Sequence, residues 1–216
     1  MDELFTDERL DPMWQRQFDT AARMPLAWLL TARQLWKAAE AAYEIAHSAH
    51  EESVRSMLQE MENKQQLISR TLSNEESERV RDISLFYVYS MLIAFTIENL
   101  AKGILIAQHA ELVMPSGAIA APIKSHDLSK LCTNALGNIS DEEKDVLDVL
   151  SDFAVWRGRY PIPLNWHEMK PRQTSTGVWI QPSQGSVWEK RILINSILER
   201  LWNLLQSIRF SGNTAT

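Results

Sequence analysis

The feature that most constrains the fold is an uncharged run from Ile83 to Ile97, bounded by Asp82 and Glu98. Its 15 residues are fewer than the roughly 20 that a helix needs to cross a bilayer, and they include serine, threonine and tyrosine. The run predicts the middle of a helix over about 74–111 whose apolar residues cover nearly every face. Such a helix belongs at the centre of a bundle or at a subunit interface.

Other amphipathic patterns surround this helix. Apolar residues at spacings of three and four predict a long helix after Pro25, a residue that suits a first helical turn. Ser73 with Glu76 and Ser140 with Glu143 have capping-box spacing, and they open two further helices. The expected helices span 25–48 with a possible continuation to about 68, then 74–111, a short one from Ser125-His126-Asp127 to about 135, one from 141 to the arginines near 157, and 186–209.

Three segments are expected to lie outside these helices. Residues 1–22 suggest an N-terminal arm or short helix, and 114–124 has the composition of a loop. Residues 160–185 hold four of the eight prolines and form an irregular, extended insert, in which 177–180 can run as a strand. The sequence therefore predicts one all-α domain over 1–216, a bundle of about five helices.

Composition narrows the function classes. The formal charge of −6 argues against a surface that binds nucleic acid by general phosphate neutralisation, and leaves a local patch at Arg157, Arg159 and Arg172. One cysteine, Cys132, excludes an internal disulfide and suggests a buried thiol. With an acidic N-terminus in place of a secretory signal, a cytoplasmic location without membrane contact is expected. Four of the eight tryptophans fall in or beside the insert, which indicates that this segment is packed.

A cluster of carboxylates and imidazoles on the first long helix raises the question of a metal site. Glu44 and His47 have the Glu-x-x-His spacing of half a di-iron site, but no second Glu-x-x-His follows, and His-Glu-x-x-His is absent. A solvated polar face is therefore the preferred interpretation. The alternative is a metal-dependent helical-bundle enzyme, which would require iron or zinc bound to the purified protein. No metal or cofactor is expected, since no glycine-rich phosphate loop or Cys-x-x-Cys pair is present.

Two motifs follow the uncharged run. Glu98 and Lys102 are four residues apart, which suits either an exposed helical ion pair or a pair of charges held in the core for function. Gly103 costs the helix about 1 kcal/mol relative to alanine, so its presence predicts the close approach of another helix. Farther on, Pro161 ends a helix beside Arg157 and Arg159, where the guanidiniums either bind phosphates or carboxylates or favour the helix dipole.

Together these motifs resemble the HEPN superfamily (higher eukaryotes and prokaryotes nucleotide-binding). The resemblance rests on Ile-Glu-Asn-Leu-Ala-Lys-Gly over 97–103, on Lys-Ser-His-Asp-Leu-Ser-Lys-Leu over 124–131, and on Trp-Arg-Gly-Arg-Tyr-Pro over 156–161. Their order and spacing carry the specificity, and the resemblance covers about 80–205. It implies a helical bundle that forms homodimers.

The resemblance also implies a function. Many HEPN proteins are metal-independent ribonucleases of toxin–antitoxin, phage-defence or RNA-processing systems, often beside a nucleotidyltransferase. An arginine stabilises charge on the phosphate, while a histidine that follows it after four to six intervening residues transfers protons for attack by the ribose 2′-hydroxyl. The residues implied here are Arg157 and Arg159 with His167 or His126 for catalysis, and Glu98, Asn99, Lys102 and Tyr160 for binding.

The spacing in this chain differs from the family pattern. Seven residues separate Arg159 from His167, and nine separate Arg157 from His167. Either the loop 160–166 compensates for the extra length or the nuclease site is absent. The first hypothesis is an RNA-cleaving or RNA-binding protein with an antitoxin-like or nucleotidyltransferase partner. The alternative is a non-catalytic HEPN-like module that binds a partner protein or a nucleotide. In that alternative the arginines pair with acids, Glu98 first among them.

Overall fold

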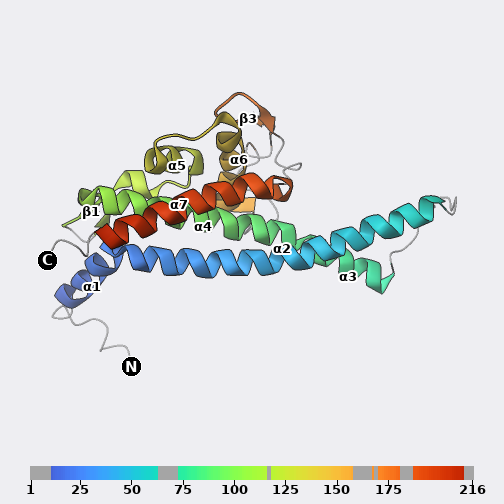
Figure 1. The fold of residues 1–216 in the computed structure, drawn as a ribbon, viewed down its shortest axis with the longest axis horizontal. Helices are drawn as coiled ribbons and strands as arrows, with labels where there is room; N and C mark the ends of the chain where they lie inside the picture. The colour runs from blue at the N-terminus through green and yellow to red at the C-terminus, as the bar shows by residue number, and fades with distance from the viewer. Residues whose placement is uncertain are drawn as a thin grey trace.

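The computed structural model describes residues 11–62, 73–115, 118–157, 167, 170–180 and 187–211 (Figure 1). These residues are predominantly helical, which confirms the all-α prediction. The α-helices are α1 Asp11–Arg23, α2 Pro25–Glu62, α3 Asn74–Ile83, α4 Leu85–Gln108, α5 Leu128–Leu136, α6 Asp141–Asp152 and α7 Arg191–Ser211. Single turns are η3 Ala110–Leu112, η4 Ala121–Lys124, the π turn η5 Phe153–Arg157, and η7 Val187–Lys190.

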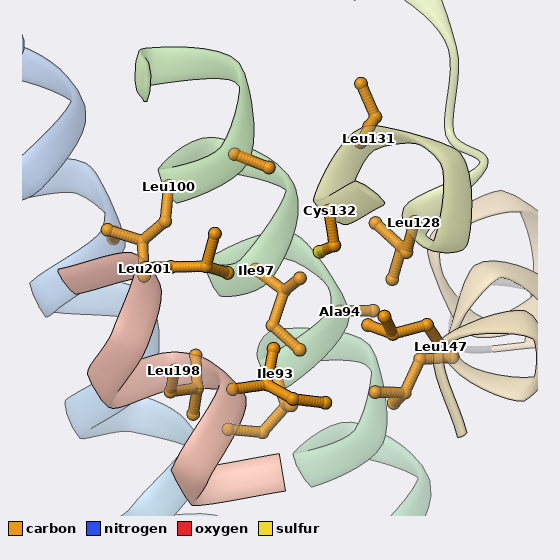
Figure 2. Close-up of a cluster of buried hydrophobic side chains, with 14 of the residues drawn as sticks. Ile93, Ala94, Ile97, Leu100, Leu128, Leu131, Cys132, Leu147, Leu198 and Leu201 are labelled. Carbon is orange, nitrogen blue, oxygen red and sulfur yellow. The ribbon is translucent and has the colours of Figure 1, made fainter. Parts of the chain in front are cut away.

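Helix α4 lies at the centre, as its uncharged run predicts. It contacts α2 and α7 on one side and α5 and α6 on the other. Figure 2 shows Ile93, Ile97 and Leu100 directed toward Leu198 and Leu201 of α7, while Ala94 lies on the side of Leu128, Cys132 and Leu147. All these side chains have an exposed fraction of 0%. A helix surrounded in this way must be apolar on almost every face, because each face meets another element.

The glycine in α4 lies where two helices come closest to it. A Cβ built on Gly103 would lie 2.7 Å from Trp28 Cβ on α2 and 3.0 Å from Leu205 Cδ2 on α7. Real Cβ atoms do not approach other atoms so closely, so alanine does not fit without a shift of the helices. The close approach predicted for this position is therefore confirmed.

The second half of α2 projects beyond the bundle, with α3 beside it (Figure 1). At 38 residues, α2 is about 57 Å long. Helix α3 has no buried residue, so this projection contributes little to the core. The exposed side chains of Val54, Met57, Leu58 and Val80 all lie on these two helices.

The single helix predicted over 74–111 is wrong in one respect, because it is interrupted at Ser84. There the amide of Ser84 bonds to the carbonyls of both Val80 and Arg81, and its hydroxyl also donates to Arg81. A serine hydroxyl that competes for backbone carbonyls favours such a break. Both predicted capping boxes are confirmed, with Ser73 opening α3 and Ser140 opening α6.

Helix α1 is the short helix that was one of the two alternatives for residues 1–22. Arg23 attaches it to the segment that follows α4, because its guanidinium donates to the carbonyls of Ala110 at 2.6 Å and Val113 at 2.7 Å. Among the described residues, the stretch Asn74–Gln108 is long and apolar enough to span a membrane, with a window of mean hydropathy 1.5, but 72% of that window is buried inside the structure. A buried central helix meets the same criterion.

The segments predicted as irregular contain two small antiparallel hairpins. One joins β1 Val113–Met114 to β2 Ala118–Ile119, inside the predicted loop 114–124. The other joins β3 Arg172–Gln173 to β4 Trp179–Ile180, which confirms an extended stretch near 177–180. The prediction that the tryptophans in and beside the insert are packed is confirmed for one of the two described ones. Trp188 stacks on Phe86 at 4.5 Å between ring centroids, whereas Trp179 is 67% exposed.

Candidate functional site

A surface groove of about 600 Å³ lies beside the turn that carries His126. Its walls come from the turn before α5, the second half of α6, the π turn and the β3–β4 hairpin. The lining residues are Lys124, Ser125, His126, Asp127, Asp148, Ser151, Asp152, Val155, Arg172 and Ser175. Because these elements are far apart in sequence, the groove exists only in the folded chain.

One imidazole of the groove is held by a buried carboxylate. Glu98 Oε2 lies 2.9 Å from His126 Nδ1, and Glu98 Oε1 accepts a hydrogen bond from Lys102 Nζ at 2.7 Å. The side chains of Glu98 and Lys102 are each 11% exposed, whereas that of His126 is 45% exposed. The pair is therefore a buried one, and the exposed ion pair considered for these residues is wrong.

The contact with Glu98 assigns different roles to the two nitrogens of the His126 imidazole. A carboxylate oxygen is an acceptor, so Nδ1 carries the hydrogen in its contact with Glu98. This leaves Nε2 of His126 to exchange a proton with a bound molecule. A buried acid that orients a half-exposed histidine is the geometry of a general acid–base group.

Local hydrogen bonds fix the turn that carries His126. Asp127 caps α5 by accepting from the amide of Lys130 at 2.9 Å, and the amide of Asp127 donates to Ser125 Oγ at 3.0 Å. Ser151 of α6 accepts from the amide of Leu128 at 3.0 Å. The start of α5 is thus attached to α6, and this attachment holds the turn in which His126 contacts Glu98 of α4.

Three carboxylates along one face of α6 hold the β3–β4 hairpin. Asp152 accepts from Arg172 Nη2 at 2.8 Å, Asp148 accepts from the amide of Ser175 at 2.5 Å, and Asp145 accepts from the hydroxyl of Thr176. The same Nη2 atom of Arg172 also donates to the carbonyl of Asp148 at 2.9 Å. The hairpin is therefore bound to α6 along its length, with Arg172 at the groove.

Burial shifts the ionisation of two groups beside Arg172. Desolvation raises the pKa of Asp152, and the positive charge of Arg172 opposes this shift. Desolvation also lowers the pKa of Arg157, against the favourable charge of Asp152. Arg157 is 8% exposed, and its guanidinium lies over the Phe153 ring at 4.6 Å from the centroid. This arginine is directed into the protein and not into the groove.

The structure brings three of the predicted site residues together: Glu98, Lys102 and His126. Asn99 is turned back onto its own helix, where its amide donates to the Phe95 carbonyl at 2.8 Å. His167 is exposed and lies outside the groove lining. Arg159 and Tyr160 fall outside the described residues. Glu98 contacts Lys102 and His126, and its expected contact with Arg159 stays a prediction because Arg159 is not described.

Sequence reasoning missed most of the groove. Arg172 was noted only as part of a basic patch, and Lys124, Asp148 and Asp152 were not singled out. A signal was available for the acids, because residues 145, 148 and 152 share one face of a helix that begins at Ser140. Nothing local indicates that the hairpin would lie against that face.

The carboxylate and imidazole cluster on α2 is used within the fold. Glu40 pairs with Arg191 of α7, His47 stacks on Tyr43 at 5.2 Å, and His50 lies 5.2 Å from the Trp188 ring. Among the described residues, no three His, Cys, Asp or Glu side chains are grouped so as to hold a metal ion. Cys132 is buried, and burial raises the pKa of its thiol.

A comparison of the chain with protein-family models, with curated proteins and with solved structures finds no match in any of the three.

Proposed function

We propose that this chain is a HEPN-like protein that acts on RNA without a metal ion, with His126 as the proton-transfer group. The observation that carries the proposal is the 2.9 Å contact of His126 Nδ1 with the buried carboxylate of Glu98 at the edge of the groove. Lys102 holds the other oxygen of that carboxylate, so Glu98 keeps one orientation. The order of motifs that resembles the HEPN superfamily supports RNA as the substrate.

In the proposed reaction, Nε2 of His126 accepts the proton of a ribose 2′-hydroxyl. The 2′-oxygen attacks the adjacent phosphorus, the bond from phosphorus to the 5′-oxygen breaks, and that oxygen takes up a proton. The products are a 2′,3′-cyclic phosphate and a 5′-hydroxyl. In the homodimer that the resemblance implies, each copy supplies one such groove.

The test is cleavage of single-stranded RNA by the full chain in the presence of a metal chelator. His126→Ala is expected to lower the rate by about 100-fold or more, the usual contribution of a general acid–base group. His109→Ala is the matched control, because His109 also pairs with a glutamate but lies at the exposed end of α4. A DNA strand of the same sequence stays intact because it lacks the 2′-hydroxyl.

Two results would overturn this proposal. One is purified wild-type protein that leaves RNA intact under these conditions. The other is a His126→Ala variant that cleaves as fast as the wild type.

A second candidate function is a non-catalytic HEPN-like module that binds a nucleotide or a partner protein. It is favoured by Arg157, which is 8% exposed, lies over Phe153 and is stabilised by the charge of Asp152. An arginine satisfied inside the protein is not available to a scissile phosphate. If the protein does not cleave RNA, calorimetric titration with ATP and GTP tests whether this second function is nucleotide binding.

A further inference from the structure

Arg172 combines a fixed orientation with unused donors. Its Nη2 donates to Asp152 and to the Asp148 carbonyl, which holds the guanidinium against α6. A guanidinium has five N–H donors, and those on Nε and Nη1 make no hydrogen bond to the described part of the chain. The side chain is 39% exposed and lines the groove.

A second cation faces the same groove from a different element. Lys124 ends η4, is exposed, and makes no ion pair with the described residues. Beside it, the Ser125 hydroxyl accepts from the Asp127 amide, so its own hydrogen remains to be donated. Lys124 and Arg172 thus offer N–H donors to the groove beside His126, one from the turn before α5 and the other from the β3–β4 hairpin.

The carboxylates of the groove are engaged by other groups. Asp127 accepts from the Lys130 amide, Asp148 from the Ser175 amide, and Asp152 from Arg172. With histidine neutral, the three aspartates still outnumber Lys124 and Arg172 by one charge. The general potential of this surface therefore does not attract an anion, and only direct hydrogen bonds from Lys124 and Arg172 could hold one. Such bonds favour a group with several acceptor oxygens.

We propose that Arg172 and Lys124 are the phosphate-binding pair of this groove and hold a backbone phosphate of the RNA beside His126. This inference rests on the proposed function for the identity of the ligand. Arg172 supplies oriented donors, and Lys124 supplies a mobile point charge. The role belongs to arginine 172 of the hairpin and not to the internal Arg157.

Binding measured separately from cleavage tests the proposal. The probe is a fluorescent single-stranded DNA oligonucleotide, which carries the phosphates but has no 2′-hydroxyl to react. Arg172→Gln is expected to weaken binding by about 10-fold or more, the usual effect of losing hydrogen bonds to a charged group. It is also expected to reduce the salt dependence of log K by about 0.7, the value for one phosphate on a single strand.

Lys124→Gln is the second variant, and it keeps the fold because Lys124 is exposed and unpaired within the described residues. It is expected to show the same loss of salt dependence. Arg172→Lys keeps the charge and therefore the salt slope, but loses the arginine donors and part of the affinity. Lys144→Gln is the matched control, since Lys144 lies on α6 outside the groove and pairs with Asp141.

The outcomes separate this inference from the proposed function. Unchanged affinity and salt slope in both Arg172→Gln and Lys124→Gln overturn the inference, even if His126→Ala abolishes cleavage. Binding that depends on Arg172 and Lys124 in a protein that never cleaves RNA supports the inference and removes the cleavage reaction. Inorganic phosphate should compete with the oligonucleotide better than chloride does at equal ionic strength, which separates a phosphate site from a general cationic surface.

Discussion

The two sides of α4 differ in what they exclude. Toward α2 and α7 the helix presents Ile93, Ile97 and Gly103, and the approach at the glycine leaves no room for one more carbon atom. On another side the same helix presents the ion pair of Glu98 and Lys102, whose carboxylate contacts the half-exposed His126. On the first side, added side-chain volume would destabilise the fold, and on the second side an unpaired buried charge would do so.

This difference shows how a single helix serves both the core and the candidate site. Glu98 and Lys102 lie one turn apart on one face, and Gly103 follows on the face toward Trp28. Packing on the apolar side fixes the rotation of α4, and that rotation aims the carboxylate at His126. The site therefore depends on the core for its geometry.

The largest effect on stability is expected on the polar side, from Lys102→Met. The variant leaves the buried Glu98 carboxylate without its cation, which costs about 3–5 kcal/mol of unfolding free energy. Urea unfolding measures the change. The double variant Glu98→Leu with Lys102→Met removes both charges, and it is expected to regain much of the loss. A single variant that loses less than about 1 kcal/mol would mean that the pair behaves as a surface ion pair.

An intermediate effect is expected on the apolar side, from Gly103→Ala. The added Cβ meets Trp28 and Leu205, and overpacking of this kind costs about 1–3 kcal/mol. The better helix propensity of alanine returns about 1 kcal/mol, so the expected result is a modest loss of stability. Thermal unfolding followed by circular dichroism measures it.

The control on the same helix is Ala107→Gly, a partly buried position in the last turn of α4, where the poorer helix propensity of glycine lowers stability by up to about 1 kcal/mol. Glycine should therefore be favoured at 103 and alanine at 107. A stabilising Gly103→Ala variant would contradict the close approach of α2 to α4.

The smallest effect on stability is expected at the groove, from His126→Ala. Its side chain is 45% exposed, and Glu98 keeps its bond to Lys102, so the change in unfolding free energy should be below about 1 kcal/mol. The same urea titration measures it. A loss above about 2 kcal/mol would make His126 part of the structural framework, and its effect on RNA cleavage would then need to be measured at matched folded fractions.

Sequence reasoning succeeded where the determining residues are neighbours along the chain. The capping boxes at Ser73 and Ser140 involve residues three apart, and Pro25 begins α2 as expected. The glycine at 103 predicted a close neighbour because glycine is unfavourable in a helix without one. Each of these inferences needs one or two turns of helix and no knowledge of the rest of the fold.

The site could be predicted only in part. Glu98 and His126 were both selected, but as members of separate motifs, and their contact joins positions 28 residues apart. Arg157 was expected at a ligand and is instead 8% exposed, with its guanidinium over the Phe153 ring of the same π turn. The hairpin that carries Arg172 is held by α6 carboxylates that no sequence motif connects to it.

The sequence by itself determined where most helices begin, that one of them is central, and that the chain is all-α. These properties follow from hydrogen bonds and apolar periodicity within single elements, which neighbouring residues encode. The tertiary structure decided that Glu98 holds His126, that Arg172 reaches the groove, and that Arg157 does not. Those choices depend on how several elements bury their apolar faces at once, and that packing is a property of the whole chain.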